Sequence, residues 1–324
     1  MARKSKAKSA SAGNAKAARP AAKPAAKSAS KPARAYGDIL YEVKDQVAWI
    51  TINRPRVMNA FREQSLDEMI HAVQSTRMDP SIACIVFTGA GDKAFSAGGD
   101  FYAMKRLNWI NGAMWNDRMQ GLAMAIRGVP IPVIAMVNGW CMGGGHELAL
   151  WCDLVIATED AMLGQTGAKV GACPTVGATQ YLPRIIGERL AREMIFCARR
   201  FTGKEAEQVG LINKAVKRKD LLAETLKWCE TIKGHSPQTI RMTKKSLNFE
   251  SDNLYSSWQH GMELLAHVWG SDEANEGMNA FLKGRAPNFQ KFRMRNKREL
   301  DQYLDGCARD LNAPPSMRGK QAAR

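Results

Sequence analysis

Two glycine-rich segments, each placed directly after a run of β-forming residues, constrain this 324-residue chain more than any other feature. The first spans 94–100 (AFSAGGD), and the second spans 138–148 (NGWCMGGGHEL) and runs on into a helical pattern. A glycine-rich turn between strand and helix leaves backbone N–H groups unpaired and lets a ligand approach them closely. It also points the positive end of the helix dipole at that ligand. The two segments therefore predict a ligand site built largely from backbone.

Strand and helix patterns alternate around these segments. Apolar and β-branched runs predict strands at 46–53, 82–88, 133–137 and 153–157. A helix is predicted over 65–77, because Ser65 and Glu68 have the spacing of a capping box and the apolar residues that follow share one face. The alternation indicates an α/β core.

The pattern becomes helical after about residue 186. Thr202 and Glu205 predict a second capping box, and Gly210 is placed to end that helix. Ser236 before Pro237 predicts the start of a helix that continues to about 248, and 254–283 is also helical in pattern. We therefore divide the chain into a basic tail at 1–35, an α/β core at 36–235, a helical region at 236–292 and a polar basic tail at 293–324.

Most of the positive charge lies in the first tail. The formal net charge is +16, and residues 1–35 hold seven Lys, three Arg and no acid, which leaves +6 for the rest. Three interpretations remain open: a disordered solubilising tail, a segment that binds nucleic acid or another polyanion, and an organelle transit peptide at 1–34. The tail has no apolar core of a secretory signal, and no run in the chain approaches the roughly 18 residues of a membrane-spanning helix. We expect a cytoplasmic protein, or an organelle-matrix protein if a transit peptide is present, with no membrane contact.

Seven cysteines are scattered along the chain without a CxxC pair. An odd number of cysteines in apolar surroundings is typical of reduced thiols rather than of a disulfide framework. No spacing resembles a zinc site, so we expect no metal.

Three common uses of a glycine loop fit poorly. A phosphate loop would end in Gly-Lys-Ser or Gly-Lys-Thr, and the dinucleotide fingerprint has a different spacing. Ser96 lies in a frame similar to that of an esterase nucleophile, but Ala94 stands where that motif has its first glycine. No histidine is evidently placed to activate this serine.

Taken together, the two loops resemble the crotonase (enoyl-CoA hydratase/isomerase) superfamily, from Val47 to about Phe292. The supporting motifs are Asn53-Arg54-Pro55, Asn59-Ala60-Phe61, Cys152-Asp153 and Phe281-Leu282-Lys283. The resemblance implies a spiral of ββα units with a helical C-terminal oligomerisation region, and a trimer or a dimer of trimers. It implies an acyl-CoA substrate and no separate cofactor, since CoA is part of the substrate.

The resemblance also assigns catalytic roles. The backbone N–H groups of Gly99 and Gly144 would hold the thioester oxygen, and one such donor is typically worth about 3–4 kcal/mol in the transition state. Glu147 matches the first of the two glutamates that ordinary family hydratases use, whereas Gly167 stands in place of the second. A two-carboxylate hydratase is therefore not the favoured interpretation.

The stretch 164–171 (GQTGAKVG) is similar to ring-acting branches of the superfamily. Dihydroxynaphthoyl-CoA synthases and 2-ketocyclohexanecarbonyl-CoA hydrolases share it, but they have an aspartate where this chain has Pro174, and they lack the glutamate matched by Glu147. The 6-oxocyclohex-1-ene-1-carbonyl-CoA hydrolases resemble it more, and they have that glutamate. We therefore expect hydration, C–C hydrolysis or both, on an alicyclic enoyl-CoA or oxoacyl-CoA. The alternatives are a linear enoyl-CoA hydratase or isomerase, a ring-closing synthase, and a non-catalytic acyl-CoA-binding homologue.

Further residues are expected around the substrate. The predicted substrate contacts are Arg56, Ala60, Ala97, Asp100, Gln165, Thr166 and Lys283. A loop at 104–119 that contains Trp109 and Trp115 is predicted to line the acyl pocket. His146, beside Glu147, is interpreted as a packing or hydrogen-bonding residue rather than a catalytic one.

Overall fold

The computed structural model describes residues 35–312, with side chains as far as Cys307. Within the described residues, the chain from Tyr36 to Asn312 forms one compact unit, and the predicted N-terminal basic tail, apart from Ala35, lies outside them. The strands are β1 (Ile39–Lys44), β2 (Val47–Ile52), β3 (Cys84–Gly89), β4 (Ala94–Ser96), β5 (Val133–Val137), β6 (Trp140–Met142), β7 (Leu154–Thr158), β8 (Met162–Gly164), β9 (Arg200–Thr202) and β10 (Lys214–Val216). The helices are α1 (Glu63–Thr76), α2 (Phe101–Met104), α3 (Trp109–Gly128), α4 (Gly144–Trp151), α5 (Gly167–Val170), α6 (Ala178–Phe196), α7 (Gly203–Gln208), α8 (Leu221–Lys233), α9 (Pro237–Asp252), α10 (Tyr255–Val268), α11 (Asp272–Leu282) and α12 (Gln290–Asn312).

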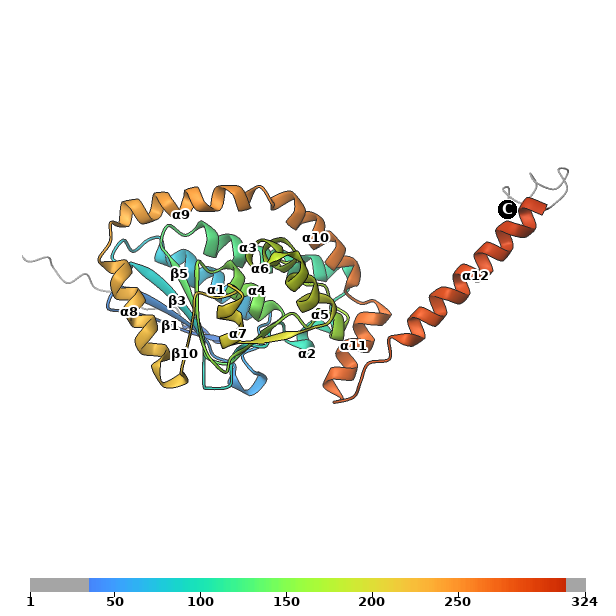
Figure 1. Cartoon of the computed structure of the whole chain (residues 1–324), viewed down its shortest axis with the longest axis horizontal. Coiled ribbons are helices and arrows are strands. Elements are labelled where there is room, and N and C mark those ends of the chain that lie inside the picture. Colours follow the sequence, from blue (N-terminus) through green and yellow to red (C-terminus); the bar gives the residue numbers. More distant parts are fainter. Residues whose placement is uncertain (1–34, 313–324) are drawn as a thin grey trace, which may run out of the picture. The chain divides into compact units, whose positions relative to one another are not determined.

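The strands form two sheets that the chain visits in turn. One sheet has the order β1-β2-β3-β5-β7-β10, in which only β1 is antiparallel to its neighbour, and the other has the order β4-β6-β8-β9. Each of the pairs β3–β4, β5–β6 and β7–β8 adds one strand to each sheet and is followed by a helix. This repetition is the spiral of ββα units that the resemblance implies (Figure 1).

Both faces of the six-stranded sheet are covered. Ile85 and Phe87 of β3 belong to the large core, which also holds α1, α3 and α10 residues. The alternate residues, Cys84 and Val86, pack on the opposite face against α8. Parallel strands buried on both faces read as continuous apolar runs, which is why these strands could be predicted from composition.

The start of α1 differs from the prediction. Ser65 is the third residue of the helix, and its hydroxyl oxygen accepts the N–H of Arg62 at 3.1 Å. Glu68 does not close a capping box, because its carboxylate accepts the N–H groups of Gly37 and Asp38, both at 2.8 Å. The predicted box at 65–68 is therefore wrong, and Glu68 instead holds the chain segment that leads into β1. The second predicted box is confirmed, with Thr202 as N-cap of α7.

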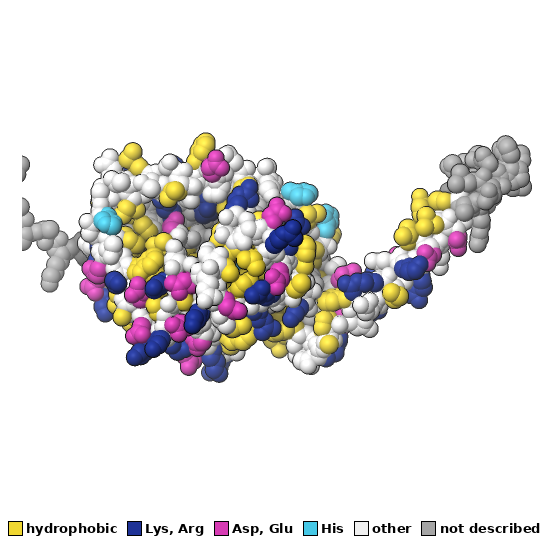
Figure 2. All heavy atoms as spheres, viewed as in Figure 1, with side chains coloured by type: hydrophobic (Ala, Val, Ile, Leu, Met, Phe, Trp, Pro, Cys, Tyr) yellow, Lys and Arg dark blue, Asp and Glu magenta, His cyan; other side chains and the backbone are white. Residues whose placement is uncertain are grey.

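The C-terminal region is helical, as predicted, but divides differently. The stretch 254–283 forms two helices, α10 and α11, separated at Gly270, which has a φ of +80°. The predicted boundary at 292/293 falls inside α12, whose first turns are held by an ion pair between Arg295 and Asp272 at 2.9 Å. Figure 2 shows basic and acidic side chains side by side along this helix. Among the residues with described placement, no helix combines the length and apolarity needed to cross a membrane.

Candidate active site

Asn59 fixes the segment that carries the first glycine loop. Its side-chain oxygen accepts the N–H of Arg54 at 3.0 Å, and its amide donates to the carbonyls of Ala90 and Ala94 at 2.9 and 2.7 Å. The buried hydroxyl of Ser96 donates to the Asn59 carbonyl at 2.8 Å. Ser96 is therefore a structural hydrogen-bond donor within the loop, in keeping with its rejection as a nucleophile.

The first glycine loop is held open by a short bridge to Phe61. The N–H of Phe61 donates to the Gly98 carbonyl and the N–H of Asp100 donates to the Phe61 carbonyl, both at 2.9 Å. The N–H of Gly98 donates to the hydroxyl oxygen of Ser96 at 3.1 Å. The N–H of Gly99, between these bonds, has no hydrogen-bond partner within residues 35–312.

The second glycine loop joins β6 to α4. Gly143 has a φ of +52°, its N–H donates to the Gly164 carbonyl at 3.0 Å, and its carbonyl accepts the N–H of Glu147 at 2.9 Å. The N–H of Gly144, at the first residue of α4, has no partner in the described part of the chain. The two loops touch, because a methyl group on Gly98 would lie 2.9 Å from the Gly144 nitrogen.

Glu147 lies one turn into α4 and is 4% exposed. Burial raises the pKa of its carboxyl group to about 8, while backbone N–H groups at Ala178 and Val176 act in the opposite direction. The Ala178 N–H donates to Glu147 Oε1 at 3.4 Å and belongs to the first residue of α6. The helix end thus supports the ionised form, but desolvation is the larger effect.

A cavity of about 70 Å³ joins these groups. Gly99, Gly144 and Glu147 line it, and Glu147 is the only carboxylate among its described lining residues. The structure therefore brings together the three predicted catalytic positions. Most of the other lining side chains are apolar, namely Phe61, Phe101, Met104, Trp115, Met119, Val170, Val176, Leu265 and Trp269.

Gly167 also lines this cavity, at the position where ordinary family hydratases would have their second glutamate. A methyl group on Gly167 would lie 2.4 Å from the Ala172 carbonyl oxygen. A glutamate would therefore require the backbone of this turn to move. The loop is shaped for glycine, and the second carboxylate is absent from the described lining.

His146 and Gln165 form a buried pair behind the second glycine loop. The Gln165 side-chain amide lies 3.0 Å from His146 Nδ1 and donates to the Gly143 carbonyl at 3.3 Å. Burial lowers the pKa of His146 to about 4, so the imidazole is neutral near pH 7. His146 does not line the cavity within the described residues, which agrees with a packing and hydrogen-bonding role.

The predicted substrate contacts divide into two groups. Ala97, Gln165 and Thr166 line the cavity. The other four predicted contacts are absent from its lining within the described residues; they are Arg56, Ala60, Asp100 and Lys283.

Those four residues occupy different surroundings. Arg56 is exposed beside a separate hollow next to Met58, and Lys283 is exposed at the end of α11. The Asp100 carboxylate pairs with Arg54 at 2.9 Å and accepts the N–H of Tyr102 at the start of α2. The Ala60 carbonyl accepts a hydrogen bond from the same arginine at 2.6 Å. Arg54 is thus engaged inside the protein, and the contacts of these four residues with CoA remain predictions.

The predicted loop at 104–119 is mostly helix. Residues from Trp109 onward belong to α3, and Trp109 is 65% exposed and absent from the cavity lining described above. Met104, Trp115 and Met119 do line the cavity. The prediction that this segment lies beside the acyl pocket is confirmed. The predictions that it is a loop and that Trp109 lines the pocket are wrong.

Leu265 and Trp269 line the cavity from the C-terminal region and were not predicted. Trp269 donates its indole N–H to Asn116 at 3.0 Å and packs onto α3, where a methyl group on Gly112 would lie 2.2 Å from its ring. Leu265 and Trp269 are about 150 residues distant from α3 in sequence, so no local pattern links them to the site. The one sequence signal that another segment packs closely on α3 is a glycine inside a helix, Gly112.

Comparison with known proteins agrees with this geometry. A family model described as enoyl-CoA hydratase/isomerase matches residues 42–293. An enoyl-CoA hydratase from Mycobacterium avium subsp. paratuberculosis K-10 is similar in structure, with a TM-score of 0.73 and 26% identity over 79% of this chain and 99% of that one. An enoyl-CoA hydratase/isomerase from Xanthobacter autotrophicus Py2 has a TM-score of 0.71 and 30% identity over 77% and 94% of the two chains.

An enoyl-CoA hydratase from Bacillus anthracis has a TM-score of 0.64 and 30% identity over 78% of this chain and 98% of its own. The family match covers well over half of the chain, and the aligned structures share the spiral described above. This chain belongs to the enoyl-CoA hydratase/isomerase family of the crotonase superfamily.

Proposed function

We propose that this enzyme adds water to an alicyclic enoyl-CoA, or hydrolyses a C–C bond of an alicyclic oxoacyl-CoA, with Glu147 as its one acid–base group. The observation that carries the proposal is the content of the cavity, where one buried carboxylate lies together with two backbone amides that have no hydrogen-bond partner in the described part of the chain. Family membership supports an enzyme that acts on acyl-CoA. The type of reaction and the alicyclic acyl group of the substrate are the parts that we propose.

The amides of Gly99 and Gly144 are proposed to bind the thioester oxygen. Chemistry at the carbons beside a thioester passes through an enolate, so negative charge develops on this oxygen. Donors already held in place stabilise that charge without reorganisation, and each is typically worth about 3–4 kcal/mol. The bonds that occupy the N–H groups of Phe61, Gly98 and Asp100 leave the Gly99 N–H available for this use.

One carboxyl group is sufficient for hydration if it moves the proton twice. Ionised Glu147 takes a proton from water as the oxygen attacks the β-carbon, and the enolate forms against Gly99 and Gly144. The carboxylic acid thus produced returns the proton to the α-carbon. For a β-oxo substrate, the same base activates water for attack on the ketone. The C–C bond then breaks to the enolate, which Glu147 protonates, and the net reaction consumes one water.

The apolar walls support a bulky acyl group. Trp115 and Trp269 contribute flat surfaces, and Met104 and Met119 contribute flexible ones that adapt to shape. An alicyclic ring next to the thioester presents a broad apolar surface to these walls, and it has less rotational freedom to lose on binding than a linear chain has.

A second candidate is double-bond isomerisation of a linear enoyl-CoA. The presence of a single carboxylate among the described lining residues favours it, because isomerisation requires only that one group remove a proton from one carbon and return it to another. No water is consumed in that reaction.

Product analysis in heavy-oxygen water separates these reactions. Alicyclic enoyl-CoA, alicyclic β-oxoacyl-CoA and linear enoyl-CoA substrates are incubated with the enzyme and analysed by mass spectrometry. Hydration places one heavy oxygen on the β-carbon, and C–C hydrolysis places one in a new carboxylate and opens the ring. Isomerisation of the linear substrate incorporates none. Turnover of the linear substrate alone would contradict the alicyclic assignment, and binding without turnover of any substrate would indicate a non-catalytic homologue.

Assembly and the basic tail are separate proposals. A trimer or dimer of trimers is supported by large apolar side chains exposed on α9, such as Leu247 and Phe249, which are 74% and 70% exposed. Sedimentation equilibrium measures this mass, and a monomer would contradict the proposal. The tail is proposed to bind polyanions; deletion of residues 1–34 should then abolish salt-dependent retention on nucleic acid, and unchanged retention would argue against it.

A further inference from the structure

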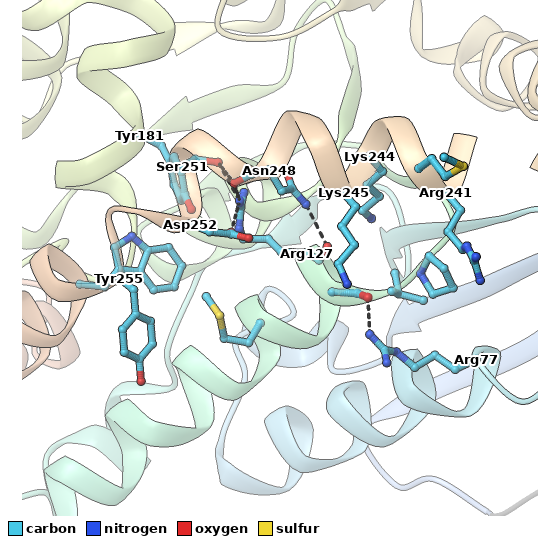
Figure 3. Close-up of a pocket in the computed structure, with 16 residues that line it drawn as sticks. Arg77, Arg127, Tyr181, Arg241, Lys244, Lys245, Asn248, Ser251, Asp252 and Tyr255 are labelled. Carbon is cyan, nitrogen blue, oxygen red and sulfur yellow. Dashed lines mark hydrogen bonds and ion pairs between the residues drawn. The ribbon is translucent and has the colours of Figure 1, made fainter. Parts of the chain in front are cut away.

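A second cavity, of about 820 Å³, lies apart from the active site. Helix α3 contributes to both: Trp115 and Met119 line the active-site cavity, whereas Arg127 and Gly128 at its C-terminal end line the larger one. Helix α9 forms much of one wall, with α10 and the end of α1 completing it (Figure 3). The volume is within the range of small-molecule sites.

One end of this cavity is strongly basic. Arg77, Arg241 and Lys245 line it, and no carboxylate pairs with any of them within the described residues. Arg241 and Lys245 are one turn apart on α9, and both extend toward the side on which Arg77 lies (Figure 3). Arg77 donates to the Gly128 carbonyl, which holds its guanidinium group at the cavity wall.

Two other cations in the wall are already neutralised. Arg127 pairs with Asp252 at 2.8 Å, and Lys244 pairs with Asp153 at 2.7 Å. Asp252 is the only carboxylate among the described lining residues. The three unpaired cations therefore leave a net positive potential, which a concave and partly apolar wall concentrates.

The other end of the cavity is aromatic. Tyr181, Tyr255 and Trp258 line it, and Tyr181 and Tyr255 lie away from Arg77 and Arg241 (Figure 3). Tyr181 stacks edge to face on Trp258, with ring centroids 5.6 Å apart, and both side chains are buried. Tyr255, which is 51% exposed, is the accessible ring among these three. Arg241 and Asp252 are eleven residues apart on α9, so the wall between the two ends is about 16 Å long.

We propose that this cavity binds a small anionic ligand that has a phosphate-bearing end and a ring-bearing apolar body. Arginine and lysine side chains that have no carboxylate partner among the described residues can form charge-assisted hydrogen bonds with phosphate oxygens. At the opposite end, the exposed ring of Tyr255 provides a surface on which a planar ring stacks. Neither the proposed reaction nor the active-site cavity is needed for this inference.

Calorimetric titration of the full-length protein tests the proposal with three probes: pyrophosphate, ADP and adenosine. ADP binding that persists after two of the cavity's cations are removed belongs to another site, the active site included. We expect ADP to bind more tightly than pyrophosphate and pyrophosphate more tightly than adenosine, and we expect the affinity for both anions to fall as salt is raised. Equal affinity for ADP and adenosine would contradict the proposal that the cavity binds phosphate. Equal affinity for ADP and pyrophosphate would contradict the proposal that the aromatic end binds a ring.

The double variant R241Q/K245Q removes two of the three free charges from exposed positions. We expect ADP affinity to fall at least tenfold. The matched control, K204Q/K219Q, removes two exposed lysines from outside the cavity and should leave affinity unchanged. Equal losses in both variants, or no loss in R241Q/K245Q, would contradict the proposal. Sedimentation velocity should show the same mass for all three proteins; dissociation of R241Q/K245Q alone would assign the cavity to an interface instead.

Discussion

Glu147 Oε1 accepts a hydrogen bond from the backbone N–H of Ala178, 3.4 Å away, at the first residue of α6. This bond links the second glycine loop to a helix thirty residues later in the chain. It favours the ionised carboxylate, whereas burial favours the neutral acid and raises the pKa to about 8. The balance between the two effects sets the pH range in which Glu147 can act as a base.

We predict that kcat/KM rises with pH and reaches half of its maximum near pH 8. Ionised Glu147 is the base that activates water, and its pKa of about 8 leaves only about a tenth of the carboxyl groups ionised at pH 7. Initial rates between pH 6 and pH 9.5 check this. A profile that is flat over this range would mean that Glu147 does not act as the base.

Stability should change in the opposite direction. The folded-state pKa of Glu147, about 8, lies above its ordinary value of 4.5, so the folded state binds the proton more tightly. The stabilisation is fully present below about pH 4.5 and is lost as pH rises through 8. Relative to Glu147→Gln, the wild type should lose a few kcal/mol over this range, to order of magnitude. Urea denaturation at pH 5 and pH 8.5 measures the difference, and a pH-independent difference would contradict it.

Gly144→Ala should lower kcat/KM at least tenfold. The added methyl group would lie 2.9 Å from the Phe61 ring and 3.3 Å from the Met119 methyl group, inside the cavity where the thioester is proposed to bind. Gly121→Ala on α3 is the control, because its methyl group meets only Ile70 at 3.4 Å. Steady-state kinetics compare the two, and equal activity of both variants would argue against an oxyanion role for Gly144.

Gln165→Ala should reduce kcat more than it raises KM. Its side-chain amide bonds both His146 and the Gly143 carbonyl, so its loss loosens the loop that presents the Gly144 N–H. Restoration of kcat by Gln165→Asn would be inconsistent with this account, because the shorter side chain does not span the same two partners. A pure KM effect would instead assign Gln165 to substrate binding.

Lys244→Met should destabilise the fold by about 3 kcal/mol. The Lys244 side chain is 7% exposed, and its ammonium group donates to Asp153 and to the carbonyls of Ile126 and Ile131, all of which lose a donor in the variant. Lys245→Met, at the next and exposed position of α9, is the control and should change stability by no more than about 0.5 kcal/mol. Chemical denaturation compares them, and similar midpoints would contradict the burial argument.

Local sequence patterns were sufficient for much of the fold. The run 133–137 was predicted with the bounds of β5, because it is continuously apolar and lies between Pro132 and Asn138. The helix at 65–77 was predicted with the wrong start, since Ser65 and Glu68 have capping spacing but bond to Arg62 and to the chain near Asp38. The contact of Glu68 with the distant segment near Asp38 decided where its carboxylate bonds, and the spacing of residues within the helix contains no information on that contact.

The candidate site divides in the same way. Gly99, Gly144 and Glu147 lie in short motifs and were predicted together. Leu265 and Trp269 reach the cavity only because α10 packs along α3, and the engagement of Asp100 by Arg54 also depends on tertiary contacts. The catalytic positions in the glycine loops were therefore predictable from the sequence, whereas the side chains from distant segments that line the cavity were not.

The measurement that tests the central claim most directly is turnover by Glu147→Gln, alongside acyl-CoA binding by the same protein. Glu188→Gln, at an exposed position on α6, is the control. The account predicts that Glu147→Gln loses turnover, that it binds acyl-CoA within a few-fold of wild type, and that Glu188→Gln does both normally. Turnover by Glu147→Gln close to that of wild type would contradict the account.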